Sequence, residues 1–162
     1  MFFHWTISEN IVLLDPINRR ILVELQRDAT LSLAALAEKV GLSQTPCWNR
    51  IKRLEIDGYI RGRVALLDRE RLELGTTVFV AVKANSHDEK WLDDFARAVE
   101  IIPEIVELYR MSGDTDYLLK VVCRDIADYD RIYKKLIRAT PMRDVSSSFA
   151  MEQIKYTTQL PL

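Results

Sequence analysis

The sequence predicts an α+β protein in which an N-terminal winged helix-turn-helix precedes a C-terminal ferredoxin-like βαββαβ sandwich. Apolar residues recur at helical spacing in three short segments up to residue 57, and a polar segment follows. Strand-like and helix-like segments then alternate in the order β-α-β-β-α-β. We therefore expect an N-terminal extension at residues 1–13, the winged helix-turn-helix at 14–67, a linker at 68–75 and the C-terminal domain at 76–162.

The first predicted helix begins after Asp15. Aspartate is a favourable N-cap, and Pro16 then occupies the first helical position, where a missing N–H costs nothing. Four apolar residues follow at helical spacing, namely Ile17, Ile21, Leu22 and Leu25. This segment therefore predicts a helix with one face in a core.

Two more short helices, separated by a tight turn, predict the helix-turn-helix itself. Ser32 and Ser43 are suitable N-caps, and Gly41 stands where a left-handed residue can end the first of the two helices. Helices that cross in a short turn need a small residue where they touch, and Ala37 meets that need. The remaining inward positions are Leu33, Leu36 and Val40 in one helix and Cys47, Ile51 and Leu54 in the other.

Strand-like segments predict a β-wing and a four-stranded sheet. Residues 59–67 suggest two short strands around Arg61-Gly62-Arg63, which would form the wing. The later strands are expected at 76–83, 105–111, 117–123 and 145–156, and the helices between them at 87–102 and 125–139. This order is that of the split βαβ sandwich.

The charge of the chain is divided unevenly between its two halves. Apolar residues make up 48% and charged residues 29%, as in an ordinary globular protein, and the net charge of −1 argues, taken alone, against a nucleic-acid binder. However, residues 1–66 contain nine Lys and Arg against seven Asp and Glu, a balance of +2. The remainder carries −3, so the basic surplus coincides with the predicted helix-turn-helix.

The polar face of the third helix is the candidate DNA-binding surface. With Ile51 at the centre of the buried side, steps of about 100° per residue turn Thr45, Asn49, Lys52 and Arg53 outward. In a major groove, Asn can pair with adenine, Arg or Lys with guanine, and Thr with a thymine methyl. Further candidates for phosphate contacts are Arg50 and the N–H groups near Ser43, Gln44 and Thr45. A merely solvated helix face is the alternative.

A turn with two carboxylates is the second candidate site. The segment from Ser112 to Tyr117 joins two predicted strands and places Asp114 and Asp116 close to Gly113. Carboxylates attract the ammonium group of a free amino acid, and N–H groups of a turn can hold its carboxylate. Gly-Asp turns are common, so a plain structural turn is the alternative.

Residues suited to catalysis or metal binding are few. His4 and His87 are the only histidines, and Cys47 and Cys123 have neither metal-site spacing nor a disulfide pattern. We therefore expect no enzyme, no metal and no cofactor, and a reducing cytoplasmic location. The apolar patches of residues 1–12 lack the features of a signal peptide or membrane span.

Taken together, several motifs resemble the Lrp/AsnC (feast/famine) family of prokaryotic transcription regulators. The resemblance spans about residues 14–160. The motifs that carry it are Leu14-Asp15, Leu36-Ala37, Gly41-Leu42-Ser43, Thr45-Pro46-Cys47, Arg50-Ile51-Lys52-Arg53-Leu54-Glu55 with Gly58, and Ser112-Gly113-Asp114 with Asp116-Tyr117-Leu118-Leu119. The ending at residues 147–161 is similar to a subgroup that includes regulators of cysteine, proline and branched-chain amino-acid catabolism. The extension at residues 1–13 and the net acidic balance depart from the family pattern.

This resemblance implies a homo-oligomer that binds double-stranded promoter DNA, senses an amino acid and controls amino-acid metabolism genes. In the family, sandwiches pair sheet to sheet into dimers, which often assemble into octamers, and the Gly-Asp turn borders the amino-acid site. The effector candidates are then Gly113, Asp114 and Asp116, with Tyr109 and Met111 as lining. Two alternatives are an enzyme similar to haem-pathway decarboxylases and an amino-acid-binding module whose DNA-binding domain is vestigial.

Overall fold

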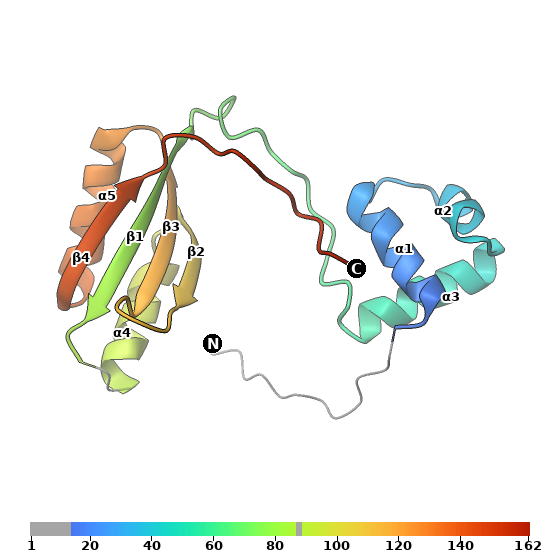
Figure 1. Ribbon diagram of the computed structural model, residues 1–162, viewed down its shortest axis with the longest axis horizontal. Coiled ribbons are helices and arrows are strands. Elements are labelled where there is room, and N and C mark those ends of the chain that lie inside the picture. Colours follow the sequence, from blue (N-terminus) through green and yellow to red (C-terminus); the bar gives the residue numbers. More distant parts are fainter. Residues whose placement is uncertain (1–13, 87–88) are drawn as a thin grey trace. The chain divides into compact units, whose positions relative to one another are not determined.

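The chain forms two compact units, which a computed structural model describes over residues 14–86 and 89–162 (Figure 1). Unit 1 comprises the described residues up to Ala65 together with Lys155–Leu162, and unit 2 comprises Leu66–Ile154. The sequence division assigned residues 155–162 to the C-terminal domain, whereas here these exposed residues group with unit 1, where Leu160 forms hydrogen bonds with Gln26. The expected extension at residues 1–13, which includes His4, lies outside the described residues, as does His87.

Unit 1 contains the three helices that the apolar spacing predicts. They are α1 (Pro16–Arg27), α2 (Leu33–Val40) and α3 (Gln44–Ile56). The Asp15 carboxylate caps α1 by accepting the Asn18 N–H at 2.7 Å, and the Ser32 hydroxyl caps α2 by accepting the Ala35 N–H at 3.2 Å. The buried side chains of the three helices form one core, made of Ile21, Leu22, Leu36, Ala37, Val40, Cys47, Ile51 and Leu54.

Gly41 makes the corner between α2 and α3. Its φ is 74°, a left-handed conformation that costs a residue with a Cβ atom roughly 1–2 kcal/mol. The reversal lets the Leu42 N–H donate to the Ala37 carbonyl at 2.9 Å, which satisfies a carbonyl at the helix end. Three residues, Gly41–Ser43, therefore suffice to connect the two helices.

The expected β-wing is absent from the described residues. After the Ile60 N–H donates to the Leu54 carbonyl at 3.1 Å, residues 61–67 run as exposed chain with no strand pairing. Gly62 lies between two arginines, and the apolar side chains that follow, such as Val64 and Leu66, stay exposed. The predicted strands are therefore wrong: residues 61–67 are exposed throughout, and a two-stranded hairpin without packing is at best marginally stable.

Unit 2 is a four-stranded antiparallel sheet with two helices. Its elements are β1 (Thr76–Ala84), α4 (Glu89–Glu100), β2 (Ile105–Arg110), β3 (Tyr117–Cys123), α5 (Ile126–Ala139) and β4 (Met142–Phe149). The strand order β2-β3-β1-β4 is that of the predicted ferredoxin-like sandwich. The fourth strand spans Met142–Phe149 instead of residues 145–156. The Ala150 N–H still donates to the Thr77 carbonyl at 2.9 Å, after which only Thr76 of β1 remains to pair with.

The sheet has one face covered by helices and one open face. Alternate β1 residues Val78, Val80 and Val82 lie in the core with the aromatic residues of α4, where the Trp91 and Phe95 rings stack with centroids 5.0 Å apart. The other alternate residues form the open face, which we define by Phe79, Ala81, Tyr109, Leu118 and the buried Val122, and which also carries Lys83 and the Glu107–Lys120 ion pair. In the sheet, Leu118 of β3 lies between Ala81 of β1 on one side and Tyr109 of β2 on the other.

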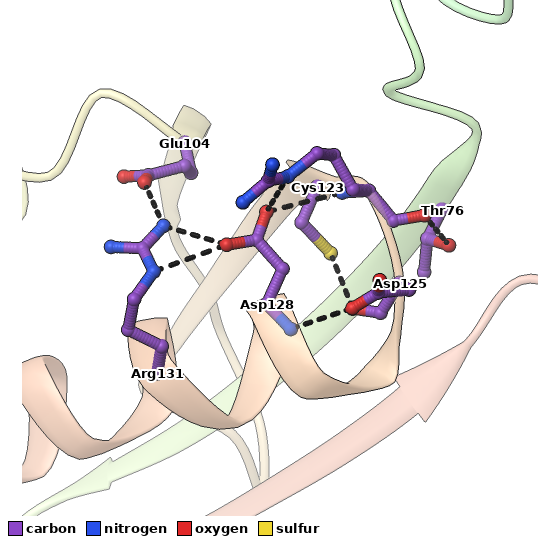
Figure 2. A network of polar contacts seen from close by, with 7 residues as sticks. Thr76, Glu104, Cys123, Asp125, Asp128 and Arg131 are labelled. Carbon is purple, nitrogen blue, oxygen red and sulfur yellow. Dashed lines mark hydrogen bonds and ion pairs between the residues drawn. The ribbon is translucent and has the colours of Figure 1, made fainter.

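An ion-pair network fastens the start of α5 to neighbouring segments (Figure 2). The Asp125 carboxylate caps the helix, and Asp128 in its first turn accepts hydrogen bonds from Arg131 at 2.8 and 3.1 Å. The Arg124 N–H donates to the same carboxylate at 3.2 Å, while Arg131 also donates to Glu104 at 2.5 Å. The Arg131 hydrogen bonds, followed by that from the Arg124 backbone, lower the pKa of Asp128 from 3.8 to about 2.

Candidate nucleic-acid interface and effector site

Helix α3 presents the exposed polar face that its sequence predicts. Cys47, Ile51 and Leu54 hold one side of the helix in the core of unit 1. The opposite side carries Thr45 and Asn49, both exposed, with Gln44 at the start of the helix. The face is therefore accessible and follows a three-residue turn, as in helix-turn-helix domains that enter the major groove.

The first turn of α3 is left open by its N-cap residue. Ser43 has the extended backbone of an N-cap, but its hydroxyl accepts no cap hydrogen bond among the described residues, unlike Asp15 and Ser32 at the other two helices. The predicted N-cap position of Ser43 is therefore confirmed, but within the part of the chain that the structure describes its side chain makes no capping hydrogen bond. The first-turn N–H groups, together with the Ser43 hydroxyl, are suited to hold an anion such as a phosphate oxygen.

Two cations on α3 are engaged by acids close to them. The Lys52 ammonium donates to the Glu55 carboxylate at 2.7 Å, and the Arg63 guanidinium donates to the other oxygen of Glu55 at 3.4 Å. The Lys52 hydrogen bond is the main cause of a lowered pKa of Glu55. The Arg53 guanidinium donates to Asp57 at 2.9 Å. These exposed pairs are worth about 0–1 kcal/mol, so a phosphate can replace the carboxylates at little cost.

Arg50 lies in a different environment from the other cations of α3. Its guanidinium forms an ion pair with the Asp15 carboxylate and donates to the Asn18 side-chain oxygen at 2.9 Å, and its side chain is 32% exposed. The Asn18 N–H and then Arg50 lower the pKa of Asp15. Arg50 therefore joins α3 to the first turn of α1, 35 residues away in sequence. The sequence carries no signal for this contact, whereas spacings of three and four residues point to the Lys52 and Arg53 pairs.

The five effector candidates lie at one end of the sheet, around the turn from β2 to β3. Gly113 has a φ of 111°, which favours glycine, and Asp114 beside it is exposed. Asp116 is structurally engaged, because its carboxylate accepts the Ala84 N–H at 2.8 Å and its own N–H donates to the Val82 carbonyl at 3.1 Å. Asp116 thus ties the turn to the end of β1 and differs in environment from Asp114.

The two proposed lining residues precede this turn. The Met111 N–H donates to the Asp116 carbonyl at 2.8 Å, and its side chain is exposed. Tyr109 lies on the open face, and its hydroxyl donates to Glu107 at 2.6 Å. Lys120 donates to the same carboxylate at 2.7 Å. The turn and its lining are thus on the surface of unit 2.

A cavity of about 590 Å³ lies at the opposite end of the sheet. It is lined by Glu70, Glu73, Gly75, Arg124 and Asp125. Sequence reasoning assigned no site there. Within residues 14–86 and 89–162, no group of three His, Cys, Asp or Glu side chains is arranged to hold a metal ion, and no helix is long and apolar enough to cross a membrane.

Two parts of the chain match known domain families. Residues 14–55 match the AsnC-type helix-turn-helix domain, and residues 77–160 match the Lrp/AsnC ligand binding domain. The DNA-binding transcriptional activator DecR of Escherichia coli is 52% identical over 151 residues, with 93% of this chain and 99% of DecR covered.

Solved structures give the same result. An AsnC family transcriptional regulator from Agrobacterium tumefaciens is 58% identical, covers 91% of this chain and 96% of its own, and has a TM-score of 0.88. A complex of the Neisseria meningitidis transcriptional regulator NMB0573 with L-Met is 35% identical, with the same coverage and a TM-score of 0.87.

Proposed function

The chain belongs to the Lrp/AsnC family of DNA-binding transcriptional regulators, and from this membership we propose that it controls amino-acid metabolism genes in response to an amino-acid effector. The observation that carries the proposal is the AsnC-type match over residues 14–55, because it falls on the unit in which α3 exposes its polar face. The ligand-binding match over residues 77–160 and the relative crystallised with L-Met support the effector. The relatives are transcription regulators, which argues against the decarboxylase alternative.

In the proposed DNA complex, α3 enters a major groove of promoter DNA. Asn49 and Thr45 face the bases, whereas Lys52 and Arg53 exchange their carboxylate partners for phosphates or guanine edges. Further phosphate contacts come from the first turn, at Ser43 and Gln44, and from Arg50 at the edge of the face. To contact a phosphate, the Arg50 guanidinium must either bind the phosphate and Asp15 together or break its ion pair with Asp15.

The proposed functional particle is a homodimer formed through the open face of the sheet, with octamers as a further assembly. Support comes from the apolar residues that define this face, of which Phe79 and Tyr109 are exposed. A dimer would place two α3 helices in successive major grooves about 34–36 Å apart, and two weakly basic units would then bind together. Since the target is the chromosome of a prokaryote, we place the protein in the cytoplasm.

The proposed effector is a free amino acid held at the turn from β2 to β3. Asp114 is the exposed carboxylate that can pair with the ammonium group, while Gly113 and Asp116 shape the turn. Tyr109 and Met111 provide exposed lining beside it. Because these groups lie on the surface, a second copy of the chain would enclose the ligand. The expected coupling to DNA binding is about 1–3 kcal/mol, and the proposed targets are amino-acid catabolism genes, such as those for cysteine, proline or branched-chain amino acids.

The test measures binding of the purified chain to the DNA upstream of its own gene, with and without each of the twenty amino acids. We expect retardation of this fragment, and an amino acid that changes the affinity by about 5–150-fold. Asp114→Ala should abolish that change and preserve basal binding, while the exposed Asp93→Ala in α4 should preserve both. A response that survives in Asp114→Ala would place the effector site elsewhere. Failure to retard any promoter fragment would favour the vestigial-domain alternative.

A further inference from the structure

The last eight residues of the chain belong to the unit that carries the helix-turn-helix. Lys155–Leu162 group with unit 1, although their side chains are all exposed, whereas the intervening segment Leu66–Ile154 forms unit 2 (Figure 1). Unit 1 is therefore connected to the sandwich at two points of the chain, after Ala65 and before Lys155. A linker alone would provide one connection.

A reciprocal pair of hydrogen bonds holds this C-terminal segment to α1. The Gln26 side chain donates through Nε2 to the Leu160 carbonyl at 3.2 Å, and its Oε1 accepts the Leu160 N–H at 2.6 Å. The two residues are 134 positions apart in the sequence. One carboxamide can fill both roles because it has a donor and an acceptor on the same planar group.

The residues next to Leu160 favour the backbone conformation that this contact needs. A residue before proline is restricted to extended backbone, and Pro161 imposes that restriction on Leu160. In extended backbone, the N–H and C=O of one residue point to the same side, as they do in a hydrogen-bonded strand pair. The Gln159 N–H donates to the Thr157 hydroxyl at 3.1 Å and forms a turn just before it.

Gln26 lies in the last turn of α1, and the opposite end of that helix is joined to α3. There Asp15 and Asn18 hold Arg50 of α3. A rigid helix of twelve residues thus has the C-terminal segment at one end and the helix with the polar face at the other. A displacement of the segment can therefore reach α3 through side chains that all lie in unit 1.

We propose that residues 155–162 are a C-terminal clasp, which fixes α1 through Gln26 and thereby positions α3 for DNA. The inference rests on the proposed function in one respect, since it takes α3 as the helix that meets DNA. It adds a second route from the effector domain to that helix. Residues 150–154 link β4 directly to the clasp, and this connection is separate from residues 66–75.

The test uses the full-length chain and Gln26→Ala, which keeps a good helix former in α1 but removes both hydrogen bonds. Amide hydrogen exchange followed by NMR should show the Leu160 N–H exchanging about fivefold faster or more, as expected for losing a hydrogen bond. Affinity for the upstream DNA fragment, measured by fluorescence anisotropy, should fall by a similar factor. Thr157→Val, which removes the turn, should act in the same direction, and the neighbouring Thr158→Val should not.

The outcomes separate the clasp from the proposed function. A wild-type chain that retards no promoter DNA would refute the proposed function, while the exchange rate of the Leu160 N–H would still report whether the clasp forms. If wild type binds DNA and Gln26→Ala changes neither exchange nor affinity, the clasp is refuted. Faster exchange at Leu160 with unchanged DNA affinity would refute its role in positioning α3.

Discussion

In the proposed DNA complex, the acidic partners of the α3 cations would limit how strongly one DNA-binding unit holds DNA. Glu55 engages both Lys52 and Arg63, and Asp57 engages Arg53. These carboxylates would stand close to phosphates in a complex and repel them, although the pairs themselves are cheap to open. Affinity must then come from the release of counterions by the cations that reach phosphates, a contribution that depends strongly on salt.

Lys52 tests whether an α3 cation exchanges its carboxylate partner for a DNA phosphate. Lys52→Ala should weaken binding to promoter DNA and reduce the slope of log K against log salt by about 0.9, the value for one lost phosphate contact. Titrations at several salt concentrations measure the slope. Lys134→Ala is the matched control, because Lys134 is also exposed and paired with an acid on its own helix, but lies in the sandwich. An unchanged slope in Lys52→Ala would remove Lys52 from the DNA backbone.

Helices, strands and turns whose formation depends on residues close in sequence could be predicted. Helices α1 to α3 follow from apolar residues at helical spacing, and the corner follows from Gly41, whose φ of 74° favours glycine. The strand order followed from the alternation of elements after Gly75, and the structure confirms it. The exposed positions of Thr45 and Asn49 followed from the same helical geometry that buries Ile51.

Elements that depend on distant partners were not predictable in the same way. The strand-like residues 151–156 lie outside the sheet, since after the hydrogen bond from Ala150 to Thr77 only Thr76 of β1 remains, and pairing register is invisible in a single segment. The wing fails because residues 61–67 have nothing to pack against. For the same reason, the contacts of Arg50 with Asp15 and of Gln26 with Leu160 leave no mark in either segment alone.

The network at the start of α5 should stabilise unit 2. Asp128 is buried, with 8% of its surface exposed, and accepts hydrogen bonds from Arg131 and from the Arg124 backbone. Asp128→Asn keeps the shape but loses the charge, and should lower the free energy of unfolding by about 2 kcal/mol, the scale of hydrogen bonds to charged groups. Calorimetry measures the loss. Asp130→Asn, at an exposed pair two positions away, should cost less than about 0.5 kcal/mol, and equal losses would contradict this account.

The lowered pKa of Asp128 predicts that the stability of the fold depends on pH. The pKa of Asp128 is lowered from 3.8 to about 2 in the folded chain, so its ionised form is the one that folding favours. Its contribution is present above pH 3.8 and is lost as the pH falls towards 2. The difference in stability between wild type and Asp128→Asn should therefore be constant above about pH 5 and shrink below pH 4. A difference that stays constant down to pH 2 would contradict the lowered pKa.

For the whole molecule, the division of charge and the open face of the sheet both favour pairing of two copies of the chain. A DNA-binding unit with a balance of only +2 gains affinity when it is held beside a second copy. The sandwich, which carries −3, has a helix-covered face and a second face with Phe79, Ala81 and Leu118 uncovered by helices. Pairing through that face would bury apolar surface and join two DNA-binding units in one particle.

Ala81 lies within the open face and offers the sharpest test of this assembly. Ala81→Glu leaves the helix-covered core untouched, because the side chain points away from Val80 and Val82. In a dimer through this face, the new carboxylate would be buried without a partner, at a cost of several kcal/mol, so the variant should be monomeric by light scattering. Since one unit then binds without its neighbour, promoter affinity should fall by about 10²-fold or more, while a single half-site should be bound as by wild type. Ile126→Glu, an equal change of charge at an exposed position of α5, should remain dimeric. A dimer that survives Ala81→Glu with full promoter affinity would show that the copies meet through another surface.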